Sequence, residues 1–470
     1  LRRRLQRRLH GRVSWRELAS GPPGARPHDE EPTSRALTPG IIALSACMLA
    51  GCTESEGGAE PAPIAWQDVT QDTLSGHSDG LAGVDGRVDP GSEDRSYGLP
   101  LMRITGSAQE LTQIHERFEE EITIVVDVTW RGQQWSGVKL ELHGGFARTV
   151  PKKSYRLVFP DDNHLEGDLF GDGDSEAYRR VVLQASWIDQ TFMRNKLTMD
   201  LMRVMDGLSP RLGYIILEMN GEWLGLYQTI ERVDRQYLER EKLDKDGNLY
   251  KAESHWANWK AKEDPLAGYD IQEGEENPHE ALGELLDALT YTPTEVADFE
   301  QEVAPRLDLE GFMAWQLVHT LAMNADTFTK NYYLYHDVDA SPGTDKARFQ
   351  IISWDADATW GNSWDGTVLT PDQGSWFGTD AFSPRLMSIP EYRDWYLALY
   401  ESALNDELAA PGILLRVAAI ESLIGPAAQA DLDRWECEST FTEELDRLRK
   451  GIAERVDTMK GVIAAERGSP

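Results

Sequence analysis

The chain has 470 residues, 40% of them hydrophobic, which is enough to bury a sizeable core in one two-lobed enzyme or in two or three ordinary domains. It carries 47 basic and 80 acidic residues, for a formal net charge of -33. A surface this acidic repels the phosphates of nucleic acid and of anionic lipid. Composition therefore excludes wholesale disorder and argues against any nucleic-acid partner.

The first part of the chain predicts export. Residues 1–34 are rich in Arg, Pro and Gly, and we expect a disordered extension, or upstream sequence translated from a start placed too early. Residues 35–52 hold a basic flank, a short apolar run and Leu-Ala-Gly before Cys52, the pattern of a bacterial lipoprotein signal peptide. The run is shorter than the ~20 residues that span a bilayer. We expect attachment to the cell envelope (outer membrane or surface) through a lipid on Cys52, and no other membrane contact.

Residues 53–96 are rich in Gly, Asp, Ser and Pro, which predicts a flexible linker between the lipid and the folded part. Cys437 is the one cysteine that follows the signal segment, so we expect no internal disulfide. No Cys and His spacing typical of structural zinc occurs in the sequence.

Residues 97–234 predict a β-rich lobe, because short apolar runs with period-2 alternation follow one another there. A hairpin has the strongest local signal, an Asn220-Gly221 turn between two apolar runs. The acidic segment 161–174 lacks the ligand spacing of an EF-hand, so we expect a solvated loop. These elements indicate a small mixed sheet with one helix. Strands are expected over 121–130, 135–144, 152–159, 181–186, 211–220 and 223–233, and the helix over 191–205.

Residues 235–465 predict a mostly helical second lobe, because apolar residues recur there with helical periodicity. The exception is a β-ribbon, with strands expected over 331–337 and 347–355 and a polar turn between them. The predicted fold class is α+β, with a β-rich N-lobe joined to a helical C-lobe that holds the ribbon.

Acidic and amide residues bracket this ribbon. Asp326 and Asn331 come just before its first strand, and Asp355 and Asp357 come just after its second. An antiparallel pair brings these positions to one edge, where oxygen ligands suit Mg²⁺ together with phosphate oxygens. The order D-x-x-x-x-N, two strands and an Asp shortly before a Gly is that of a protein-kinase catalytic site. In that template Asp326 accepts the substrate hydroxyl proton, and Asn331 and the later acids hold the metal.

The sequence leaves open whether Asp355 or Asp357 is the main metal ligand. It also leaves open a purely structural alternative, in which Asp326 caps a turn and the later acids are solvated.

A phosphate-transferring site also needs cations. Lys152 and Lys153 begin the expected strand 152–159, and successive strand residues face opposite ways, so only one of the two can face a nucleotide. We favour Lys153, with Lys152 as the alternative. A solvated lysine pair on an edge strand is the competing interpretation.

Two further residues are candidates for nucleotide contact. Arg194 lies at the N-terminus of the expected helix, which favours anions, and Asp189 is placed to orient it. The alternative for Arg194 is a surface charge on an amphipathic helix. Glu231 lies in the segment 229–233 between the lobes, where a nucleotide base would meet a hinge.

Five segments together resemble the spore coat protein H (CotH) kinase family: PKKSYRLVF, D-x-T-x-x-R-N-K-L (189–197), N-G-E-W-L-G-L-Y-x-x-x-E (220–231), NADTFTKNYYLY and ISWDADATWG. The resemblance covers roughly residues 97–380. It implies an atypical protein-kinase-like fold that uses ATP and Mg²⁺ or Mn²⁺ to phosphorylate Ser or Thr of exported proteins. It also implies that Asp326 is catalytic, that Asn331 and the WDAD acids bind metal, and that a PKK lysine binds phosphate.

The sequence departs from the family pattern in two places. His143-Gly144-Gly145 stands where an Arg-Gly stretch is usual, and Trp360 stands where Phe is common. The acidic insertion 263–280 is expected to adjust the substrate groove.

Three functions remain open at this point. The first is an active kinase whose partners are a nucleotide and a Ser/Thr-containing exported protein. The second is a catalytically silent, lipid-anchored binding or adhesion protein with the same fold. A metal-dependent hydrolase is disfavoured because no His cluster accompanies the acids.

Overall fold

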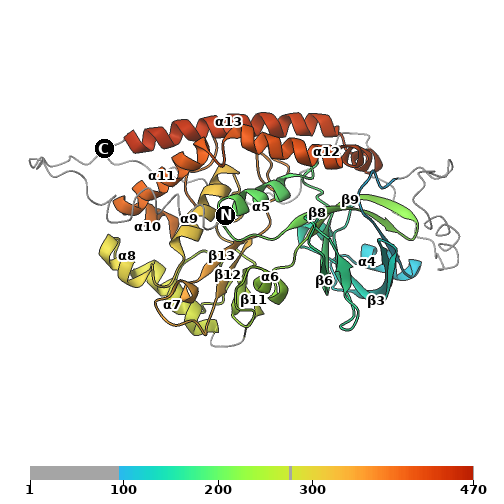
Figure 1. The fold of residues 1–470 in the computed structure, drawn as a ribbon, viewed down its shortest axis with the longest axis horizontal. Coiled ribbons are helices and arrows are strands. Elements are labelled where there is room, and N and C mark those ends of the chain that lie inside the picture. The colour runs from blue at the N-terminus through green and yellow to red at the C-terminus, as the bar shows by residue number, and fades with distance from the viewer. Residues whose placement is uncertain (1–94, 275–277, 469–470) are drawn as a thin grey trace, which may run out of the picture. The chain divides into compact units, whose positions relative to one another are not determined.

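The computed structural model describes residues 95–274 and 278–468 (Figure 1). The predictions for residues 1–52, and all but the last two residues of the predicted linker 53–96, therefore lie outside the described residues.

Seven strands form a closed barrel in the order β1-β2-β3-β4-β7-β9-β8. β1 pairs parallel with β8, and all other neighbours pair antiparallel. Closure leaves none of these strands with an unpaired edge. The strands are β1 (Leu101–Thr105), β2 (Thr123–Trp130), β3 (Gln133–Leu142), β4 (Tyr155–Val158), β7 (Arg180–Gln184), β8 (Leu212–Met219) and β9 (Glu222–Ile230), and helix α4 (Ala108–Glu116) packs against β2.

The predicted strands of the first lobe are confirmed in place and type. Their sheet is mixed, as expected, but it is closed into a barrel. β1 was not predicted, and its parallel pairing with β8 closes the sheet into a barrel. The hairpin is confirmed: Asn220 and Gly221 have φ angles of 48° and 78°, as a two-residue hairpin turn of type I′ requires. The segment 161–174, expected to be a loop, contributes β5 (Leu165–Gly167), which pairs with β6 (Glu176–Tyr178).

The second half contains a four-stranded antiparallel sheet where the sequence predicted a two-stranded ribbon. Its order is β11-β10-β12-β13, with β10 (Asn248–Ala252), β11 (Tyr269–Glu273), β12 (Tyr332–His336) and β13 (Gln350–Ser353). The predicted strands correspond to β12 and β13. The acidic insertion 263–280 supplies β11 and so extends the sheet.

Helices make up most of the rest, as predicted, and the α+β class is confirmed. They are α5 (Arg194–Val204), α6 (Arg235–Arg240), α7 (Pro278–Tyr291), α8 (Val296–Glu302), α9 (Leu309–Leu321), α10 (Ser383–Met387), α11 (Pro390–Asn405), α12 (Ala410–Arg434) and α13 (Phe441–Gly468), with short 3₁₀ helices η1 (Phe146–Arg148) and η2 (Asp345–Ala347).

The helix predicted over 191–205 is confirmed as α5, and its apolar side chains are buried in a cluster to which both the barrel and the helices contribute. Leu197, Leu201 and Met202 are fully buried in the same cluster as Trp315 of α9, and α5 contacts both α9 and β8. The helix therefore lies against the barrel on one side and the helical core on another.

α12 and α13 run side by side, and α12 also packs on β9 of the barrel (Figure 1). By length and composition alone α12 is apolar enough to span a membrane, a test that core helices of soluble proteins also pass. Its last turn holds a buried carboxylate, Asp431, that enters the barrel's hydrogen-bond network.

Candidate functional site: an acidic cluster at the end of the β12–β13 pair

Asp326 and Asn331 meet at the start of β12. The Asp326 carboxylate accepts a hydrogen bond from the Asn331 amide nitrogen over 2.9 Å and forms an ion pair with the Lys330 ammonium over 2.9 Å. Asn331 has a φ of 57°, a left-handed conformation that Asn tolerates better than most residues. Its backbone N–H donates to the carbonyl of Ala252 at the end of β10, over 2.9 Å. The turn therefore places the Asn331 side chain in contact with the Asp326 carboxylate.

Asp355 and Asp357 follow β13 at the same edge, because Tyr332 pairs with Ser353. Burial, and then repulsion from Asp326, raises the pKa of Asp355. Burial, and then repulsion from Asp355 and Asp189, raises the pKa of Asp357 well above its usual range. The structure thus brings the acids on both sides of the strand pair into one electrostatically coupled cluster.

A divalent cation fits the chemistry of this cluster. Carboxylates that repel one another are stabilised by a cation between them, which lowers their pKa values again. Among residues 95–274 and 278–468, no group of three or more His, Cys, Asp and Glu is arranged to hold a metal ion. Mg²⁺ does not require such a cage, since it is usually held by one or two carboxylates with water and phosphate oxygens completing its shell.

A buried histidine is hydrogen-bonded to residues next to the cluster. His319 lies in α9 and is fully buried. Its Nε2 hydrogen-bonds the Ser353 hydroxyl over 2.6 Å, and its Nδ1 hydrogen-bonds the Asn324 amide over 3.1 Å. The Asn324 Oδ1 in turn accepts from the Asp326 backbone N–H over 3.2 Å. The imidazole therefore links the end of β13 to the turn that carries Asp326.

This histidine should make the protein less stable in acid. Burial lowers the pKa of His319 to about 3. Between that value and the ordinary pKa of about 6.5 the unfolded chain binds the extra proton, so stability falls as pH falls, by roughly 2 kcal/mol at pH 5. The variant His319→Gln cannot be protonated at this position. In urea unfolding at pH 7 and pH 5, we expect its free energy of unfolding to fall by roughly 2 kcal/mol less than that of the native chain. Equal losses in the two proteins would contradict this assignment.

Arg194 lies beside the cluster and is oriented by Asp189, as the sequence suggested. Its Nη1 donates to Asp189 Oδ1 over 2.5 Å and to the Thr191 hydroxyl over 3.1 Å. The side chain is fully buried, which excludes the surface-charge alternative. Within the described part of the chain, its Nε and Nη2 have no hydrogen-bond partner. Buried unpaired donors are costly, so these two groups suit an additional anionic or polar partner.

Lys152 contacts groups that do not belong to the acidic cluster. Its ammonium donates to the carbonyls of Ala185 and Leu226, over 3.1 and 2.6 Å, and to the Asp431 carboxylate over 2.7 Å. Burial lowers the pKa of Lys152 and raises that of Asp431 to about 6, so desolvation outweighs the attraction between them. All three of these contacts are with groups of the protein itself.

Lys153 points to a different neighbourhood. The prediction that the two lysines begin a strand is wrong, because β4 starts at Tyr155 and both lysines lie in the segment before it. Its ammonium donates to the Arg148 carbonyl over 2.6 Å and lies 4.9 Å from the centre of the Phe118 ring. Lys152 and Lys153 are only 1% and 8% exposed, so the solvated lysine pair is excluded.

Glu231 is held between two arginines at the junction that follows β9. Arg211 and Arg240 each donate twice to its carboxylate from their side chains, over 2.7 to 3.2 Å, and the Arg211 backbone N–H adds a further bond. The carboxylate is therefore fully occupied by the protein, and Glu231 does not join the acidic cluster.

Sequence reasoning missed several residues at the cluster. Lys330 lies inside the D-x-x-x-x-N motif, and a basic residue there in so acidic a chain was a usable signal. Lys251 of β10 attracts Asp355 and pairs with Glu253 over 2.7 Å. Gln184 and Asn195 reach the Asp357 loop from distant segments, and no local pattern marked them.

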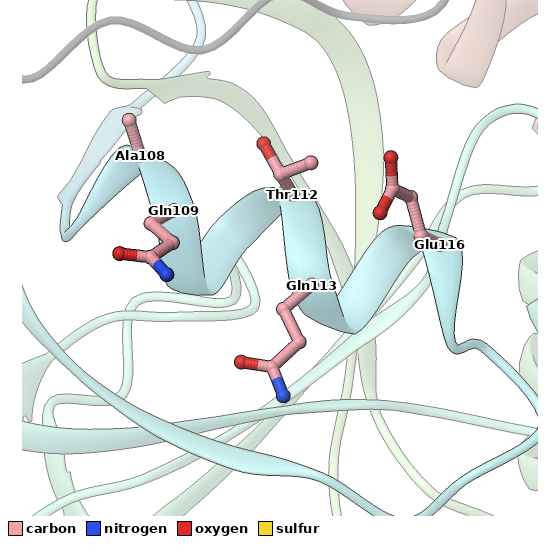
Figure 2. A pocket seen from close by; sticks show the side chains of 5 residues that line it. All are labelled: Ala108, Gln109, Thr112, Gln113 and Glu116. Carbon is pink, nitrogen blue, oxygen red and sulfur yellow. The ribbon is translucent and has the colours of Figure 1, made fainter.

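A surface hollow on the barrel side lies apart from this chemistry. It is lined by polar side chains of α4, Gln109, Thr112, Gln113 and Glu116, together with Ala108 (Figure 2). None of the clustered acids lines it, and we assign it no role.

The described residues form an α+β protein with a candidate site for a cation and phosphate. The protein combines a seven-stranded barrel with a helical part, and the candidate site is the cluster of acids and one amide at the end of the β12–β13 pair. Residues 140–459 match the family model described as "CotH kinase protein", and the chain belongs to that family. It is similar to the "Inner spore coat protein H" of Bacillus subtilis (strain 168), with 26% identity over 356 residues, 72% of this chain and 92% of the relative. The family resemblance seen in the sequence is thereby confirmed.

A likeness to a solved structure is much weaker. The complex of HipA, HipB and operator DNA from Shewanella oneidensis MR-1 includes a chain that is 13% identical, with 82% of this chain and 76% of that chain covered and a TM-score of 0.30. A TM-score that low does not assign a fold.

Proposed function

We propose that this protein is an atypical, two-lobed protein kinase that transfers the γ-phosphate of ATP to Ser or Thr of an exported or cell-envelope protein. The observation that carries the proposal is the pairing of Asp326 with Asn331 and Lys330 beside the half-buried acids Asp355 and Asp357. Phosphoryl transfer depends mostly on positioning and on neutralising charge, and this cluster offers both.

Each residue of the cluster has a role in the proposal. Asp326 accepts the proton of the substrate hydroxyl, and its bond to Asn331 fixes the direction of the carboxylate. Asn331, Asp355 and Asp357 would hold Mg²⁺ or Mn²⁺, which supplies charge neutralisation to the phosphates when bound. Lys330 pairs with the Asp326 carboxylate and so adds positive charge close to the hydroxyl acceptor.

Among the predicted nucleotide contacts, Arg194 is the strongest candidate, because two of its buried N–H groups lack a partner among the described residues. Lys153 or Lys152 would have to exchange a protein partner for phosphate. For Glu231 we propose an anchoring role at the junction, since both oxygens accept from arginines.

The name of the Bacillus subtilis relative refers to the spore coat, an external layer, which supports an exported location for this chain. We propose that a lipid on Cys52 provides its membrane contact, that its partners are a nucleotide and a protein substrate, and that nucleic acid is not among them.

A silent binding or adhesion protein with the same fold is the second candidate. It is favoured by one observation: both lysines of the PKK segment are already engaged by protein groups. In that case the acidic cluster would be a remnant of an active site.

Incubation of residues 95–470 with labelled ATP and Mn²⁺ or Mg²⁺ tests the two candidates. We expect label on the protein or on an added Ser/Thr-containing protein, and a metal-dependent rise in melting temperature with ATP. Neither signal would appear in a silent binding protein. Label on the protein that persists unchanged in Asp326→Asn would show that transfer, if real, occurs elsewhere.

A further inference from the structure

Two amide side chains tie the loop that carries Asp357 to distant parts of the fold. Gln184 is the last residue of β7, and Asn195 lies in the first turn of α5. The Gln184 amide nitrogen donates to Asp357 Oδ2 over 3.1 Å, and the Asn195 amide nitrogen donates to Gln184 Oε1 over 2.9 Å. The backbone N–H of Ala356 donates to Asn195 Oδ1 over 3.1 Å. These contacts form a continuous bridge between the barrel, α5 and the acidic loop.

The backbone N–H of Ala356 fixes which atoms donate and which accept along this bridge. A backbone N–H can only donate, so the Asn195 atom that faces Ala356 must be oxygen, and its NH₂ group must face Gln184. The Gln184 oxygen therefore accepts, and its own NH₂ group is left to face Asp357. Only an acceptor oxygen of the carboxylate can receive that bond. The bridge thus sets the rotation of the Asp357 carboxylate.

We propose that Gln184 and Asn195 are positioning residues that hold Asp357 Oδ2 and leave the remaining lone pairs of the carboxylate to a divalent cation. The inference rests on the proposed function insofar as that function gives Asp357 a metal. Partners that hydrogen-bond a ligating carboxylate orient it, and their loss commonly costs ~10–100-fold in metal affinity. Asn195 is only 2% exposed, so water cannot readily replace its two bonds.

The variants Gln184→Met and Asn195→Leu test the bridge, with Mn²⁺ affinity measured by electron paramagnetic resonance, both without nucleotide and with a non-hydrolysable ATP analogue. We expect the Kd for Mn²⁺ to rise ~10–100-fold in each variant. Because the two side chains act in series, the double variant should lose little more affinity than the weaker-binding single variant. Melting temperatures without metal confirm that each variant is folded.

Gln228→Met is the matched control. Gln228 stands directly opposite Gln184 in the β7–β9 pair, is buried, and donates its amide to the Phe192 carbonyl over 2.6 Å. Its loss removes a comparable hydrogen bond without touching Asp357, so Mn²⁺ affinity should stay close to that of the native chain.

Unchanged Mn²⁺ affinity in both Gln184→Met and Asn195→Leu would overturn the bridge, as would an equal loss in Gln228→Met. A native chain that binds Mn²⁺ tightly but transfers no phosphate would overturn the proposed function and leave the bridge intact. A native chain that binds no Mn²⁺ under either condition would overturn both.

Discussion

Asp326→Asn is expected to lower phosphoryl transfer by ~10²–10⁴-fold, the range that a positioned general base contributes. The substitution keeps the size of the side chain but removes the proton acceptor and the partner of the Lys330 ammonium. Because Asp326 is partly exposed, the melting temperature should change little. Initial rates with labelled ATP at saturating Mn²⁺ give the measurement.

The matched control is Asp339→Asn. Asp339 is exposed in the turn that follows β12, at the opposite end of that strand, so this variant removes one negative charge without touching the cluster. Its transfer rate should stay near that of the native chain. If Asp326→Asn transfers phosphate as fast as Asp339→Asn does, Asp326 is not the proton acceptor.

Lys152→Met is expected to lower the free energy of unfolding by about 3–5 kcal/mol, because it leaves the buried Asp431 carboxylate without its cation. Asp431 also accepts the backbone N–H of Leu226 over 2.6 Å, so the pair joins α12 to β9. Urea unfolding measures the effect. Lys153→Met is the matched control. Among the residues that the structure describes, its ammonium donates to one carbonyl, so its loss should cost about 1.5–3 kcal/mol.

The same experiment separates a structural Lys152 from a phosphate-binding one. A structural lysine predicts lost stability that is partly restored in the double variant Lys152→Met/Asp431→Leu, because an apolar pair carries no desolvation penalty. A phosphate-binding lysine predicts weaker ATP binding at unchanged stability. Gly225→Ala provides an independent test of this contact: an added Cβ would lie 2.0 Å from Asp431 Oδ2, at a φ of 105° that Ala avoids.

The local features of the site could be read from the sequence. The pair Asn220-Gly221 predicts a tight hairpin, because a two-residue type I′ turn needs two positive φ angles and few other pairs accept them. The strand pair β12–β13 is marked by its apolar runs, and antiparallel pairing then necessarily brings the residues before the first strand beside those after the second. The meeting of Asp326 and Asn331 with Asp355 and Asp357 follows from that geometry alone.

Only the tertiary structure decided where the cations and amides go. Lys152 contacts Asp431, 279 positions away in the sequence, and Gln184 contacts Asp357, 173 positions away. Local periodicity predicts neither contact. Closure of the barrel by parallel β1–β8 pairing is equally non-local. The sequence predicted that Lys152 and Lys153 face different ways, but the buried partner of Lys152 lies on a helix near the far end of the chain.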